Sequence, residues 1–132
     1  MSILLAVHSF VRWVLIVVSL AAVAKMAWGW LRRAKFEKAD QALISGFSGL
    51  MDLQATLGLT YLLWSGFAQN YFPAYRFAHA GTMILAVLVA HLPARWKKAA
   101  DNARFRAGLL ATLGALVLVF IGVSLLPKGW LS

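Results

Sequence analysis

The sequence predicts an all-α integral membrane protein, a single domain of residues 1–132 in which a bundle of four helices crosses the bilayer. The chain is 62% hydrophobic and 13% charged, with a mean hydropathy of +0.78. This composition is far more apolar than that of an ordinary soluble domain. The apolar residues also gather into four segments, each close to the ~20 residues that cross a hydrocarbon core. These segments cover about 3–30, 42–67, 77–92 and 107–126.

Basic residues gather in the first and third of the three connections between these segments, whereas the middle connection and the C-terminal tail carry almost no charge. By the positive-inside rule the two basic connections face the cytoplasm, so both termini are expected on the outer, periplasmic side. The net charge of +9 is thereby explained by topology and attraction to anionic headgroups, without nucleic acid as a partner. Nine of the thirteen basic residues lie in or beside these two connections: Arg32, Arg33, Lys35, Lys38, Arg95, Lys97, Lys98, Arg104 and Arg106.

Several kinds of site are excluded by what the sequence lacks. It has no cysteine, so it offers no disulfide, no thiolate metal site and no covalent c-type haem attachment. It has no phosphate-binding loop, zinc-protease motif or nucleophile elbow for phosphoryl transfer or hydrolysis. The first apolar run is much longer than the core of a signal peptide and no basic residue precedes it, so we expect it to be retained.

The first apolar segment carries two polar residues in its outer part, His8 and Arg12. Residues four apart share a helix face, so both side chains point the same way, with Arg12 about 6 Å deeper at 1.5 Å per residue. Charge inside a membrane usually faces the bundle interior and has a partner. We therefore expect His8 and Arg12 to form one polar stripe inside the bundle.

The second segment is the least lipid-like, because serines, threonines and glycines recur along it together with Asp52 and Gln54. Small and hydroxyl-bearing residues favour close helix contacts, so we expect this helix to pack its polar residues against the others rather than expose them to lipid. Asp52 has two interpretations. It forms an ion pair with Lys25 at the inner level of the antiparallel neighbour, or it accepts protons beside a quinone.

The third segment opens with Arg76 and His79, which share a helix face. The first and third helices run in the same direction, so His8 and His79 are expected at nearly the same depth near the outer boundary. A neutral imidazole is a good axial iron ligand, and two histidines at one level can meet across a haem whose propionates lie near Arg12 and Arg76. The spacing also fits histidines that only pack between helices.

His91 is the third histidine, and it follows His79 by twelve residues. At 1.5 Å and 100° per residue it lies about 18 Å further inward on another face, so it cannot serve the same haem. We interpret it as an interfacial histidine beside Pro93 and Arg95, or as part of a site for a quinone or a partner subunit. The fourth segment has no ionisable residue in its middle and is expected to be a wall of the bundle.

The two histidine-containing stretches carry a family resemblance. The stretch His8–Trp13 (His-Ser-x-x-Arg-Trp), with Arg76–His79 (Arg-Phe-x-His), resembles small four-helix bacterial membrane proteins catalogued as cytochrome b-like. The resemblance covers most of the chain in helix order, but its identities are confined to these stretches. It implies that His8 and His79 ligate a haem b, that Arg12 and Arg76 belong to the cofactor site, and that the protein lies in the bacterial inner (cytoplasmic) membrane.

One departure from this family pattern is Ala78, where an acidic residue often precedes the helix-three histidine. It implies a more apolar pocket and a weaker proton-coupled role.

Three hypotheses about the function follow. In the first, the chain is an electron-transfer subunit with one haem b near the outer face, a quinone nearby and other membrane subunits as partners, rather than a stand-alone enzyme. In the second, it is an accessory subunit of a respiratory or photosynthetic complex without its own cofactor. In the third, it is a small transporter whose path is lined by Asp52, Gln54 and Lys25.

Overall fold

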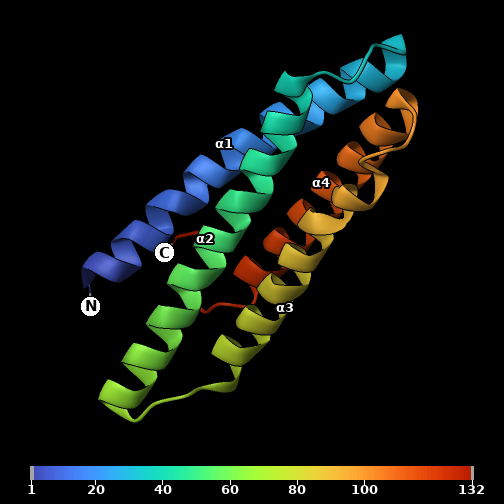
Figure 1. Cartoon of the computed structure of the whole chain (residues 1–132). Helices are drawn as coiled ribbons and strands as arrows, with labels where there is room; N and C mark the ends of the chain where they lie inside the picture. The colour runs from blue at the N-terminus through green and yellow to red at the C-terminus, as the bar shows by residue number, and fades with distance from the viewer. Residues whose placement is uncertain (1, 132) are drawn as a thin grey trace.

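The computed structural model describes residues 2–131 and shows an all-α fold, as predicted. Four long helices run up and down in a bundle, and no strand occurs among the described residues (Figure 1). Two short 3-10 helices, η1 and η2, follow α3 and α4. The elements are α1 (Ser2–Arg32), α2 (Lys38–Gln69), α3 (Ala74–His91), η1 (Leu92–Trp96), α4 (Asp101–Ser124) and η2 (Gly129–Leu131).

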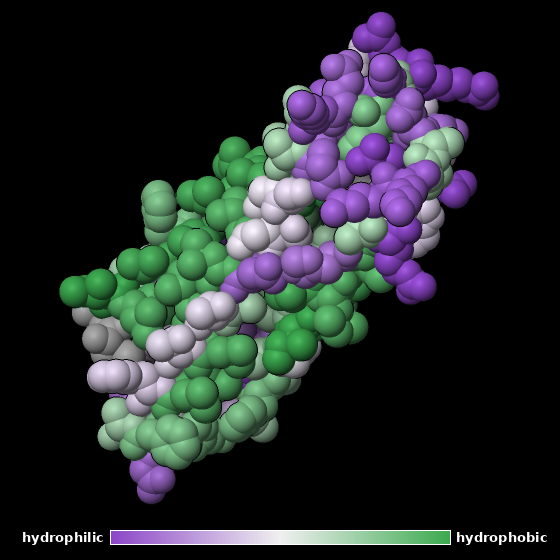
Figure 2. All heavy atoms as spheres, in the orientation of Figure 1, coloured by the Kyte–Doolittle hydropathy of each residue, from purple (hydrophilic) through white to green (hydrophobic). Residues whose placement is uncertain are grey.

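Three helical stretches are long and apolar enough to cross a membrane, which is the composition of a membrane protein. They are Ile3–Arg32, Ala74–Trp96 and Asp101–Ser124. Helix α2 is 32 residues long but does not join this set, because its serines, threonines and glycines lower its hydropathy. Hydrophilic residues gather at one end of the molecule, which we call the basic end, where Arg32 and Lys97 lie in the two basic connections (Figure 2).

The helices pack in a ring. Helix α1 contacts α2 and α4, and α3 contacts α4 and α2, so α1 and α3 lie diagonally across the bundle. Apolar residues fill the basic end and the middle; Phe105, for example, is fully buried and its ring lies where any side chain at Gly29 would be. Sites in helical bundles are built between facing helices. The diagonal pair α1 and α3 is therefore placed to share one.

The start of α2 is fixed by Asp40, which is almost completely buried. Its Oδ2 accepts a hydrogen bond from the Glu37 backbone N–H at 2.9 Å in a capping box, and its Oδ1 lies 2.7 Å from Lys25 Nζ. The predicted pairing of Lys25 with Asp52 is therefore wrong. Lys25 pairs with Asp40 because Asp40 also caps the start of α2, where unpaired backbone N–H groups favour an anion.

The polar face of α2 points away from the bundle, contrary to our expectation. Ser45, Asp52, Thr56 and Thr60 are exposed, while the apolar residues that α2 buries are Ile44, Phe47, Met51 and Leu62. In Figure 2 a band of pale and hydrophilic residues crosses the apolar surface of this side of the molecule. Apolar residues occupy the interior because burying them contributes more free energy to folding than burying hydroxyl groups that already bond to the helix backbone.

Candidate functional site

A cavity of about 150 Å³ lies inside the bundle, at the half away from the basic end. Helices α1, α2, α3 and α4 all contribute to its wall. The four residues proposed from the sequence, His8, Arg12, Arg76 and His79, all line it. The two histidines come from the diagonal helices α1 and α3. The other lining residues are mostly apolar and include Leu15, Met51, Leu62, Met83, Val87, Val119 and Val123.

His79 is oriented by the backbone of α4. Its Nδ1 lies 2.7 Å from the carbonyl oxygen of Gly122, which can only accept a hydrogen bond, so Nδ1 carries the proton. The other ring nitrogen, Nε2, is then an acceptor. Histidines that ligate metals commonly donate their remaining N–H to a backbone carbonyl, because this fixes the ring and its tautomer. His79 therefore has the arrangement that an axial ligand needs.

His8 is held by two residues of α2. Its ring packs directly over Gly58, where an added Cβ would lie 3.1 Å from His8 Cε1. Its backbone carbonyl accepts a 2.8 Å hydrogen bond from Gln54 Nε2. Two buried polar atoms at this place have no hydrogen-bond partner among the described residues: His8 Nδ1 and Gln54 Oε1. Since a buried unpaired polar group costs about 1–3 kcal/mol, such a pair indicates a place for a ligand.

The two arginines reach the cavity from opposite helices and rest on aromatic rings. Arg12 is 8% exposed, and its guanidinium lies 5.1 Å from the ring centroid of Trp13 and 5.6 Å from that of Trp130. Trp130 belongs to η2, so the tail after α4 folds back onto α1. The expected inward stripe of His8 and Arg12 is thus observed, with an aromatic environment that cationic guanidinium groups favour.

Arg76 is anchored near the C-terminal end of α2. It donates a 3.0 Å hydrogen bond to Ser65 Oγ, and it lies over the rings of Tyr61 and Tyr71 at 5.7 Å and 5.4 Å. A guanidinium is a strong partner for carboxylates because it donates several hydrogen bonds from one plane. The cavity is therefore an apolar space with two imidazoles and two cations on its wall.

The wall between α2 and α3 is thin. Leu59 of α2 and Ile84 of α3 line the cavity, yet they are 38% and 45% exposed. One layer of side chains thus separates the cavity from the outside of the bundle. A cavity of about 150 Å³ holds a single small ring, so a porphyrin needs these flexible side chains to swing outward, with methionines such as Met83 adapting their shape.

The structure gathers no group of three or more histidine, aspartate or glutamate side chains suited to a metal ion within residues 2–131. A haem needs fewer protein ligands than a free ion, since the porphyrin supplies the others. The donor set of His8 and His79 therefore fits a haem better than a bare metal ion.

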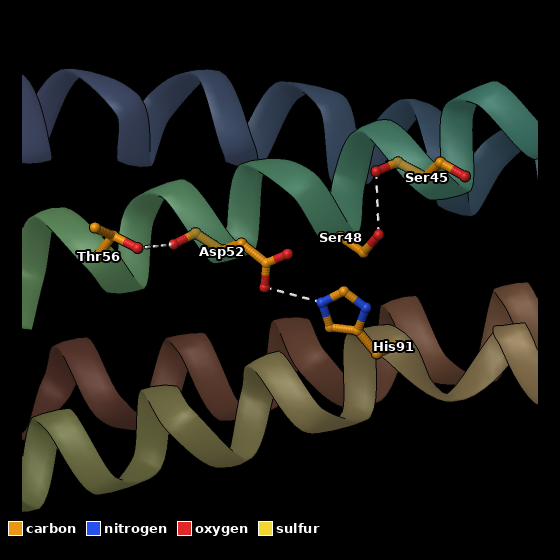
Figure 3. A network of polar contacts seen from close by, with 5 residues as sticks. All are labelled: Ser45, Ser48, Asp52, Thr56 and His91. Carbon is orange, nitrogen blue, oxygen red and sulfur yellow. Dashed lines mark hydrogen bonds and ion pairs between the residues drawn. The ribbon is translucent and has the colours of Figure 1, made fainter.

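Asp52 and His91 lie outside this cavity and contact each other. His91 Nε2 is 2.9 Å from Asp52 Oδ1, on the outward side of α2 and α3 (Figure 3). The three residues proposed for a transport path are also separated. Lys25 contacts Asp40, Asp52 contacts His91, and Gln54 lines the cavity, so they do not form one path.

The sequence did not single out Gly58 or Gly122, and it named Gln54 only for a transport path, yet all three contact the histidines of the cavity. Gln54 and Gly58 stand four residues apart on one face of α2, which is the only sequence signal that joins them. Gly122 acts through its carbonyl, which carries no side-chain signature. The comparisons with known proteins add no assignment: no protein-family model matches the chain, and neither a curated protein nor a solved structure is significantly similar to it.

Proposed function

We propose that the chain is a cytochrome b-like membrane redox subunit that holds one haem b between His8 and His79. The single observation that supports this most is the shared cavity, which has both histidines, from diagonal helices, and both arginines on one mostly apolar wall. The hydrogen bond from His79 to Gly122 and the unpaired Nδ1 of His8 support the use of both imidazoles as iron ligands.

Each residue has a defined part in this proposal. His8 and His79 hold the iron, while the Gly122 carbonyl fixes the His79 ring. Arg12 and Arg76 hold the propionates by charge-assisted hydrogen bonds. The apolar wall excludes water, which tunes the potential of a haem. When bound, the haem supplies reversible one-electron exchange.

The membrane setting completes the proposal. All four helices span the bacterial inner membrane, with the basic end in the cytoplasm and the termini outside. Helix α2 crosses although it is less apolar, since α1 and α3 flank it. One haem near the outer face cannot carry electrons across the whole bilayer, so the chain works with other membrane subunits of an electron-transfer complex.

The test is a reduced-minus-oxidised spectrum of the full chain, purified after expression with ample haem. Wild type is expected to show a b-type haem spectrum, and His8→Ala and His79→Ala are each expected to lose it. His91→Ala is the matched control, because His91 lies outside the cavity, and it should keep the spectrum. Loss of the spectrum in His91→Ala, or its survival in both other variants, contradicts the ligand assignment.

An accessory subunit without a cofactor is the second candidate. It is favoured by Gly46, Gly49 and Gly81, since an added Cβ at each would meet nothing within 4 Å among residues 2–131. Glycine costs up to about 1 kcal/mol in a helix relative to alanine, so glycines facing open space point to contacts outside the chain. Colourless protein that co-purifies with larger membrane subunits would favour this candidate.

A further inference from the structure

The pair formed by Asp52 and His91 is a polar feature on the outward surface of the bundle, between α2 and the last residue of α3. The two side chains are 51% and 48% exposed, so about half of each faces outward (Figure 3). Ionisable residues in membrane segments almost always face protein or water, because contact with hydrocarbon is costly. This side of the bundle therefore requires a cover that is itself able to hydrogen-bond.

The surroundings of the pair are built for close helix contact. Ser45, Gly49, Asp52 and Thr56 recur at spacings of three and four on α2 and form one stripe, which we call the α2 face. The Thr56 hydroxyl donates a 2.8 Å hydrogen bond to the Asp52 carbonyl, and no described residue lies within 4 Å of an added Cβ at Gly49. The face is narrow, and its hydroxyl groups, those of Ser45 and Thr56, already make hydrogen bonds within α2. Small residues at such spacings let helix backbones approach each other in membranes.

The charge pattern of this surface is self-complementary. A contact around a twofold axis along the bundle places each residue opposite the same surface of a second copy at equal depth. Asp52 supplies a carboxylate and His91 an imidazole with a second ring nitrogen, Nδ1, that makes no hydrogen bond within the described residues. Each imidazole can therefore bridge its own Asp52 and the partner subunit's Asp52. Neither a lipid tail nor an apolar helix offers such groups.

We propose that the α2 face, with His91, is the interface of a homodimer in which the two Asp52–His91 pairs meet across the twofold axis. This explains why the least apolar helix turns its polar side outward instead of into its own bundle. It also gives the open position at Gly49 a use that the single chain does not provide. None of the residues of this interface lines the cavity of the proposed haem site.

The absence of cysteine from the chain makes the test direct. Single variants Ser45→Cys and Thr56→Cys are reconstituted in bilayers and treated with a short bis-maleimide cross-linker. Val117→Cys is the matched control, since Val117 is exposed on α4, away from the α2 face. Ser45→Cys and Thr56→Cys are expected to give a band of twice the 14.5 kDa chain mass, and Val117→Cys is expected to give none.

Two second-site changes test the pair within that assay. Adding Asp52→Asn or His91→Phe to Thr56→Cys is expected to lower the dimer yield several-fold at low protein-to-lipid ratio, without altering a haem spectrum. A monomer at both test positions, equal cross-linking at Val117, or yields unchanged by both second-site changes overturns the proposal. Protection of Thr56→Cys from the linker by added decylubiquinone, with no dimer seen, also overturns it and assigns the pair to a quinone. Failure of the haem proposal shows separately, as a colourless protein that still dimerises.

Discussion

At the scale of single residues, the two histidines of the cavity are supported in different ways. The ring of His79 is fixed by a hydrogen bond to the Gly122 carbonyl on α4. The ring of His8 is fixed by packing, because it rests on Gly58 of α2. A histidine held by packing responds to volume, whereas one held by a hydrogen bond responds to loss of its acceptor. The two sides of the site are therefore separable by mutation.

Gly58→Ala tests the packing at His8. The new Cβ would lie 3.1 Å from His8 Cε1, so the ring must shift by a few tenths of an ångström. We expect haem affinity to fall about tenfold, equal to about 1.4 kcal/mol. Gly46→Ala is the control, because its Cβ meets nothing within 4 Å in the part of the chain that the structure describes, and it should stabilise the helix by up to about 1 kcal/mol. Equal haem titration curves for the two variants would contradict this role of Gly58.

Arg12→Gln tests the cation at the cavity wall. Arg12 is buried against Trp13 and Trp130, so its removal takes away the charge that a propionate would meet. We expect haem to bind roughly 10- to 150-fold more weakly, since a charge-assisted hydrogen bond contributes about 1.5–3 kcal/mol. Arg106→Gln, at an exposed position of α4, should leave the affinity unchanged. Haem titration of both variants decides, and equal affinities would remove Arg12 from the site.

At the scale of elements, α2 is tied to its neighbours by the buried Asp40 at its start. Asp40→Ala removes a helix cap and leaves Lys25 without its carboxylate. A lost cap costs about 0.5–2 kcal/mol and the pair adds to it, so we expect a loss of about 1–3 kcal/mol. Asp101→Ala, exposed in the first turn of α4, should cost less than 1 kcal/mol. Thermal unfolding in detergent measures both, and equal losses would show that Asp40 is not special.

The helices themselves were predictable because hydropathy and length decide them. Each of the four predicted segments overlaps one observed helix, but 77–92 and 107–126 end one and two residues past α3 and α4, and α2 and α4 begin at Lys38 and Asp101, ahead of the apolar runs. Helical backbone continues past the apolar part of both helices, and at α2 the capping box of Glu37 and Asp40 sets the start. The outward turn of the polar α2 face was not predictable in this way. It depends on which face of α2 offers the bulkier apolar residues to the core.

At the scale of the whole molecule, the distribution of charge predicts how the bundle sits in the membrane. The basic end is expected in the cytoplasm, because nine of the thirteen basic residues lie there. Lys97→Cys should then react with an impermeant maleimide only in inverted vesicles. Gln69→Cys, exposed at the far end of α2, should react only from the outside of intact cells. The reverse pattern would contradict the proposed orientation.

The site was predictable in part. His8, Arg12, Arg76 and His79 were identifiable because polar residues in apolar helices are few, and helix direction set the ends at which they lie. Their contacts were not. The partners of Lys25, Asp52 and His91 depend on the register between helices, which crossing angles set and a linear sequence does not display. The support from Gln54, Gly58 and Gly122 was hidden for the same reason.

The most direct test of the central claim is a haem titration of the purified wild-type chain, followed by a reduced-minus-oxidised spectrum. We expect saturation at one haem per chain, with the low-spin b-type spectrum of iron held by two imidazoles. Absence of saturable binding, or a high-spin spectrum that His8→Ala and His79→Ala leave unchanged, would contradict it.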